Sequence, residues 1–98
     1  MEKYTVRVEL HSDQYVPDFE TLHDAMRKEG FSKLITSVSG EVYHLPRGEY
    51  NILTNKNRSQ VLDSAKRAVN ATGESAEILV TESAGRLWDG LTKKKIVS

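Results

Sequence analysis

His23 is the side chain of this sequence best placed for acid–base chemistry, because a permanent cation follows it at helical spacing. His23 comes four residues after Phe19 and four before Arg27, so on a helix the three lie along one edge. An imidazole can take or give a proton near neutral pH while a guanidinium holds a phosphate, which are requirements of RNA cleavage without a metal. We therefore take His23 and Arg27 as candidate catalytic residues. The alternative is a surface helix carrying an ordinary row of ion pairs.

Three further arginines are candidate RNA contacts. Arg47 follows Pro46 in a tight turn, from which a guanidinium can hold a phosphate with two hydrogen bonds. Arg58 belongs to the first turn of a predicted helix, where backbone N–H groups favour an anion. Arg7 alternates with apolar residues in a predicted strand and so points away from them. The alternative for each is a solvated surface residue.

Several other kinds of site are excluded by the residues themselves. The chain has no cysteine, so it has no disulfide, thiolate metal site or cysteine nucleophile. It also lacks a glycine-rich phosphate loop, a His-Glu-x-x-His motif and the aromatic pattern of an RNA-recognition motif. We accordingly predict no metal site and no cofactor. A small-molecule regulatory domain is the least favoured function, because no concentrated polar pocket can be recognised.

Hydrophobic periodicity predicts the elements that must position these residues. Apolar residues at every second position predict a strand over 4–10, covered on one face only. Phe19, Leu22 and Met26 lie on one stripe of a predicted helix over about 17–29, which ends at Gly30. A helix from Asn57 to about Gly73 is predicted from the capping box of Asn57 and Gln60.

The remaining segments predict strands. Residues 31–38 and 76–81 each read as one strand, and 50–54 forms another, either separately or as the continuation of a long bent strand. Residues 41–45 fit the far arm of a hairpin. Leu87, Trp88 and Leu91 fit one amphipathic turn that folds back as a lid. The terminal Lys93, Lys94 and Lys95 are typical of a solvated or frayed tail.

This order, β-α-β-β-α-β in under a hundred residues, is the split βαβ or ferredoxin-like plan of the α+β class. It predicts a four-stranded antiparallel sheet with both helices on one face and the other face open to partners. The 98 residues make one folded unit, which we expect to be a domain over 1–85 followed by a short segment with a basic tail over 86–98.

Charge and hydropathy restrict the class of partner and the location. Fourteen basic and fourteen acidic residues give a formal net charge of zero, so the chain lacks the basic excess of a general nucleic-acid binder. Residues 1–49 carry a net charge of −3 and residues 50–98 carry +3, so a polyanion must be met by a local patch. No apolar run of membrane-spanning length and no apolar signal region occur, and we expect a cytoplasmic protein without a membrane partner.

The sequence resembles the GhoS family over roughly residues 4–82. The resemblance rests on the Gly-x-x-x-x-Leu-Pro-Arg turn from Gly40 to Arg47, on Tyr50-x-Ile52-x-Thr54, and on Met26 closing the first helix before Phe31. It implies a ferredoxin-like protein akin to the Cas2 nucleases, acting as the antitoxin of a type V toxin–antitoxin pair by cleaving the toxin's messenger RNA. It also implies a basic residue on the first helix in cleavage, at a position close to His23. A histidine there, unlike a permanent cation, is charged only part of the time near neutral pH.

Two kinds of function follow from these observations. The first is an endoribonuclease antitoxin in which His23 and Arg27 carry cleavage without metal or with weak metal assistance, and Arg7, Arg47 and Arg58 contact RNA. The second is a noncatalytic module that binds RNA, or another protein through its open sheet or exposed strand edge. The sequence leaves both a monomer and a homodimer open.

Overall fold

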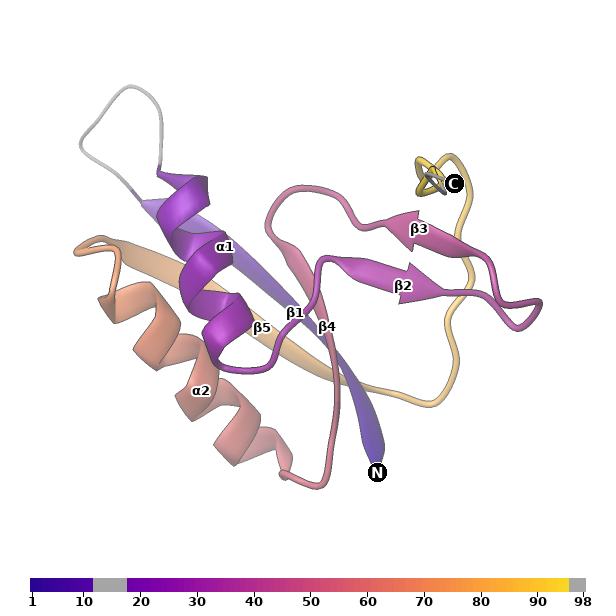
Figure 1. Cartoon of the computed structure of the whole chain (residues 1–98). Helices are drawn as coiled ribbons and strands as arrows, with labels where there is room; N and C mark the ends of the chain where they lie inside the picture. Colours follow the sequence, from indigo (N-terminus) through magenta and orange to yellow (C-terminus); the bar gives the residue numbers. More distant parts are fainter. Residues whose placement is uncertain (12–17, 96–98) are drawn as a thin grey trace.

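A computed structural model of the chain describes residues 1–11 and 18–95 (Figure 1). In chain order its elements are β1 (Glu2–His11), α1 (Phe19–Lys28), β2 (Leu34–Thr36), β3 (Val42–His44), β4 (Glu49–Thr54), α2 (Arg58–Asn70) and β5 (Ser75–Ser83). The fold is therefore a small α+β domain with antiparallel sheets. No helix in this described part is long and apolar enough to cross a membrane.

The main sheet has three strands in the order β4-β1-β5, with β1 antiparallel to both neighbours. The alternation of β1 places Tyr4, Val6, Val8 and Leu10 on one face, where all four are buried. In the register, Val6 lies opposite Tyr50 of β4 and Val80 of β5. The predicted strand at 4–10 is thus confirmed as the centre of the sheet.

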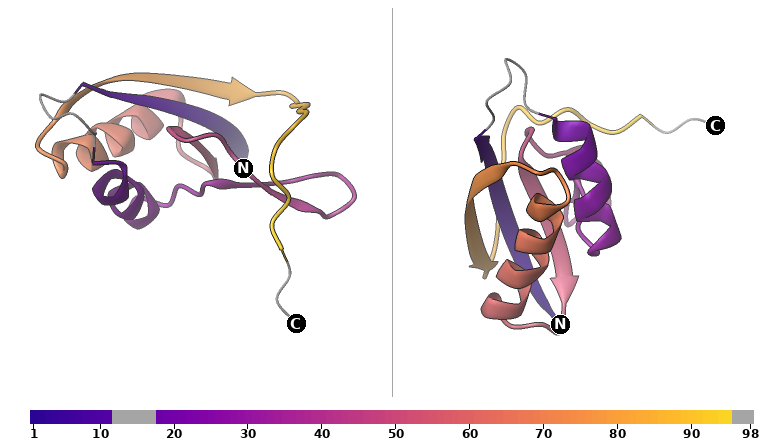
Figure 2. Two further views of the ribbon diagram at one scale, coloured as in Figure 1. Left: turned by 90° about the horizontal axis from the view of Figure 1, so that it is seen from above. Right: turned by 90° about the vertical axis from the view of Figure 1, so that its left-hand side faces the viewer.

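Both helices cover the same face of this sheet (Figure 2, left), as the sequence predicts. Leu22 and Met26 of α1 and Val61 and Ala65 of α2 are fully buried in one cluster with the inward side chains of β1. The side chain of Asn57 accepts a hydrogen bond from the N–H of Gln60, and the side-chain oxygen of Gln60 accepts one from the N–H of Asn57, so the capping box is present. The helix α1 begins at Phe19, with Asp18 as its N-cap. Pro17, where the predicted helix begins, lies outside the described residues.

The expectation of a four-stranded sheet is wrong in the described residues. Of the segment predicted as one strand over 31–38, Ser32 forms a single bridge with Asn51 of β4, with N···O distances of 2.8 and 2.7 Å. The chain then leaves the sheet edge, and β2 pairs with β3 in a separate two-stranded sheet. Strand propensity favours extended chain but does not specify its pairing partner. The short turn at 37–41 keeps the entropy cost of closing the loop between β2 and β3 low, which favours this local pairing. The predicted hairpin arm at 41–45 is therefore confirmed as β3.

The segment after β5 folds back, but as extended chain rather than the amphipathic turn expected around Trp88. Its backbone runs beside β3, where His44 N donates to Thr92 O at 2.9 Å and Lys94 N donates to Val42 O at 2.8 Å. The Trp88 ring meets the Tyr43 ring edge-on with 5.6 Å between centroids. The backbone at 92–94 thus lies beside β3 as a third extended segment next to the hairpin.

The sheet face away from the helices is less open than expected. Nη1 of Arg86 donates to Thr5 Oγ1 at 3.2 Å and to Asn51 Oδ1 at 2.9 Å, both on that face. Partial burial of the Arg86 guanidinium at this position lowers its pKa. The C-terminal segment therefore turns inward over β1 and β4 after leaving β5.

Candidate active site

His23 is held against the sheet by the hydroxyl of Tyr50. Its ring Nδ1 and the Tyr50 hydroxyl are hydrogen-bonded, and the two rings meet edge-on with 5.7 Å between centroids. Tyr50 points inward because it lies opposite Val6 on the covered face of the sheet. His23 occupies the edge of the apolar stripe of α1, so the helix and β4 together fix the orientation of the imidazole.

The surroundings of His23 favour the neutral imidazole. Burial lowers the pKa of His23, and the charge of Lys33 lowers it further; Asp24 and Glu20 oppose this effect, while Arg47 adds to it. Tyr50 is almost fully buried, and this burial raises the pKa of its hydroxyl. At neutral pH the pair is therefore an uncharged imidazole beside a protonated phenol, a state suited to accepting a proton.

A groove of about 430 Å³ opens beside this pair, between α1 and the chain that enters β2. Its lining includes the following side chains: His23, Asp24, Arg27, Phe31, Ser32, Lys33, Leu34 and Tyr50. Phe31 is an apolar member of this lining, with its ring centroid 6.5 Å from that of Tyr50. The groove thus combines an acid–base group with cations on a partly apolar surface.

Charges of both signs lie near the imidazole: the cations Lys33 and Arg47, and the carboxylates Asp24 and Glu20. Arg27 is mostly exposed, and its Nη2 lies 3.4 Å from the Asp24 carboxylate one turn earlier on α1. Arg47 places its guanidinium carbon 4.7 Å from the centroid of the Phe19 ring, and that ring lies 6.0 Å from the ring of His23. The structure therefore brings His23, Arg27 and Arg47 to one place.

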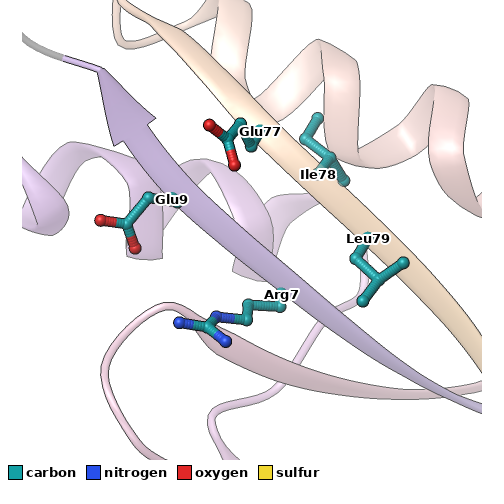
Figure 3. Close-up of a pocket in the computed structure, with 5 residues that line it drawn as sticks. All are labelled: Arg7, Glu9, Glu77, Ile78 and Leu79. Atoms are coloured by element: carbon teal, nitrogen blue, oxygen red, sulfur yellow. The ribbon is translucent and has the colours of Figure 1, made fainter.

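Arg7 lies elsewhere, on the opposite face of the sheet. Figure 3 shows it with Glu9 on β1, beside Glu77 and Leu79 of β5, around a shallow hollow of about 410 Å³. Glu9 and Glu77 lie directly opposite one another, so this hollow is acidic as well as basic. A ligand seated beside His23 does not reach Arg7 without passing around the sheet.

Arg58 is also distant from the groove. It begins α2, and its Nε lies 3.9 Å from Oε1 of Glu82 on β5. Two of the five predicted site residues thus lie apart from the other three: Arg7 on the far face of the sheet and Arg58 at the start of α2, near Glu82 of β5. Within residues 1–11 and 18–95, no three His, Asp or Glu side chains gather in a way that could hold a metal ion.

Tyr50 and Lys33 are not among the functional candidates that residue type and spacing predict. In the sequence Tyr50 is only a strand residue of the family pattern, although a tyrosine on the covered face of a strand needs a polar partner. That requirement, together with a histidine at the edge of a facing helix, is the signal that could have found it. Lys33 offers no such signal, because its position depends on the chain turning away from the sheet after Ser32.

Comparisons with known proteins agree with this reading of the chain. The family model described as Endoribonuclease GhoS matches residues 1–86, which include both helices, all five strands and the groove. A search of curated proteins finds no match to the chain. On the family match, the chain belongs to the GhoS endoribonuclease family.

Proposed function

We propose that this protein cleaves single-stranded RNA in the groove beside His23, and that its target is a toxin's messenger RNA, as an antitoxin of its family. The observation that supports this most is the hydrogen-bonded His23–Tyr50 pair in a groove that Arg27 and Lys33 also line, where burial and the charge of Lys33 lower the pKa of the imidazole. A base next to several cations matches the needs of phosphodiester cleavage.

The proposed reaction is an in-line transfer of the phosphate to the neighbouring 2′-oxygen. When His23 donates its Nδ1–H to the Tyr50 oxygen, Nε2 carries the lone pair that accepts the proton of the 2′-hydroxyl. The 2′-oxygen forms a bond to phosphorus and the bond to the 5′-oxygen breaks. The products are a 2′,3′-cyclic phosphate and a 5′-hydroxyl.

The leaving 5′-oxygen needs a proton donor on the far side of the phosphorus, because attacking and leaving oxygens lie in line. We assign this role to the ammonium group of Lys33, which lines the same groove. Arg27 is the phosphate clamp that stabilises the charge of the phosphorane. Arg47, held over Phe19, is placed to bind the phosphate of a neighbouring nucleotide.

Cleavage of labelled single-stranded RNA in EDTA tests this proposal. We expect His23→Gln to reduce the single-turnover rate by about 10²-fold or more, as loss of a general base does. Arg27→Ala should reduce it by about tenfold to a hundredfold, the worth of one charge-assisted hydrogen bond.

His44→Gln is the matched control, because His44 is an exposed histidine on β3 outside the groove. It should cleave at the rate of the wild-type chain. Intact RNA with the folded wild-type chain, or an unchanged rate in His23→Gln, would reject the proposed site.

A further inference from the structure

Two aromatic rings and two fully exposed aliphatic side chains gather where the chain after β5 passes the β2–β3 hairpin (Figure 1). The half-buried rings of Tyr43 and Trp88 are inclined at 65° to one another. With Val38 and Leu87 they line a hollow of about 470 Å³, a size within the roughly 300–1,000 Å³ of ligand sites. Exposed apolar side chains gathered around a hollow are typical of a binding surface.

Both sides of this hollow are held in place by polar contacts. On the C-terminal segment, Nη1 of Arg86 donates to Thr5 and Asn51 of the main sheet. On the hairpin, the hydroxyl of Tyr43 donates to Oε2 of Glu41 at 2.8 Å. The surface is therefore formed before a ligand arrives, which lowers the entropy cost of binding.

The charged side chains around this surface are basic. A second hollow of about 240 Å³ adjoins the first, since Val38, Arg86 and Trp88 line both. Among the described residues that line the two hollows, the charged ones are Lys3 and Arg86, and none is a carboxylate. Aromatic rings beside cations suit a flat ring that carries a negative charge, which describes the base and phosphate of a nucleotide.

The strand β2 connects this surface to the groove beside His23. Leu34, at one end of β2, lines the groove, and Thr36, at the other end, lines the smaller hollow. Two residues of a strand span about 7 Å. A single strand of RNA seated in the groove can therefore continue along β2 to the aromatic rings.

We propose that Val38, Tyr43, Leu87 and Trp88 form a base platform, a second subsite for single-stranded RNA in which one nucleobase stacks on Trp88 and a phosphate meets Lys3. This inference rests on the proposed function, because it takes the substrate strand as the ligand. The family match ends at residue 86 and so does not account for Leu87 or Trp88.

The fluorescence of Trp88 reports on the base platform directly, because the chain has one tryptophan. A short 2′-deoxy single strand titrated in EDTA should quench it, and an abasic strand of the same length and charge should quench it far less. Trp88→Ala should raise the Kd of a labelled strand, measured by fluorescence anisotropy, by about tenfold. Trp88→Phe keeps a ring for stacking and should raise the Kd less.

Two pairs of exposed positions separate the base platform from the rest of the surface. Lys3→Gln should lower the slope of log Kd against log salt by about 0.7, the value of one phosphate contact on a single strand, whereas Lys66→Gln on α2 should keep the wild-type slope. Leu87→Asp adds a carboxylate without removing a packed side chain, because Leu87 is 100% exposed, and it should weaken binding. Leu79→Asp, at an exposed position of β5, should bind like the wild type.

Cleavage measured on the same samples separates this inference from the proposed function. RNA that is cut while the Kd stays unchanged in Trp88→Ala would overturn the base platform and leave the proposed active site intact. Quenching of Trp88 by the strand without cleavage would support the base platform and reject the proposed activity, and the absence of both would reject both. A mononucleotide that quenches Trp88 at the same concentration as the strand would assign the hollow to a free small ligand and overturn the RNA subsite.

Discussion

At the residue scale, the pKa of His23 decides when the proposed site is active. Burial and the charge of Lys33 lower that pKa below the usual value of about 6.5. If the neutral imidazole is the base, the cleavage rate should rise with pH, with a midpoint below pH 6.5, and then level off. A rate profile measured by single turnover checks this, and a midpoint above that of an ordinary histidine would contradict the proposed role.

The same lowered pKa makes folding stability depend on pH with a defined sign. The unfolded chain binds a proton at His23 more readily than the folded chain does. The contribution of His23 to the free energy of unfolding is therefore fully present above pH 6.5 and is lost as the pH falls through the lower pKa of the folded state. Denaturant unfolding from pH 7.5 to 5 should show a shallower loss of stability in His23→Gln than in the wild type. His44→Gln should keep the wild-type slope.

Tyr50 is a positioning residue in this account, because it acts through His23. Tyr50→Phe keeps the buried ring but removes the hydroxyl that holds Nδ1, so it should lower the single-turnover rate by about tenfold and cost about 1 kcal/mol of stability. RNA affinity, measured by fluorescence anisotropy, should change little. A merely structural hydroxyl would leave the midpoint of the pH–rate profile in place, whereas we expect that midpoint to move.

At the element scale, the turn before β4 depends on Gly48. Its φ is +88°, and a Cβ atom built there would lie 2.7 Å from the carbonyl oxygen of Val8, where backbone cannot give way. Gly48 O also accepts the hydrogen bond of Val8 N at 2.7 Å. Gly48→Ala should therefore cost about 1–3 kcal/mol, measured by denaturant unfolding. Gly40→Ala is the comparison, since Gly40 has a similar φ of +89° but open space around its Cβ position, and it should cost less.

The elements also show what the sequence could predict. The alternation around Val6 and the capping box of Asn57 each determine a local conformation, and both were confirmed. The strand expected over 31–38 is confirmed only at Leu34–Thr36, as β2, and not as a member of the main sheet, because its residue types favour extended chain without specifying a pairing partner. Ser32 pairs with β4, whereas Leu34–Thr36 pair with the local hairpin. The cluster of His23 and Arg27 followed from helical spacing, while Lys33 depended on that unforeseen change of partner.

At the scale of the whole molecule, the two faces of the sheet divide the predicted RNA contacts. His23, Arg27 and Arg47 lie with the helices, and Arg7 lies on the far face beside two glutamates. An RNA bound beside His23 therefore meets cations along α1 and the turn before β4. We therefore expect cleavage on that side alone.

Mapping an uncleavable RNA analogue by NMR tests this central claim most directly. A short single strand with 2′-deoxy sugars lacks the attacking hydroxyl and binds without being cut. Titrated into labelled protein in EDTA, it should shift the signals of His23, Lys33 and Arg47 and leave those of Arg7 and Leu79 in place. Shifts confined to Arg7, Glu9 and Leu79, with the His23 signals unmoved, would contradict the account.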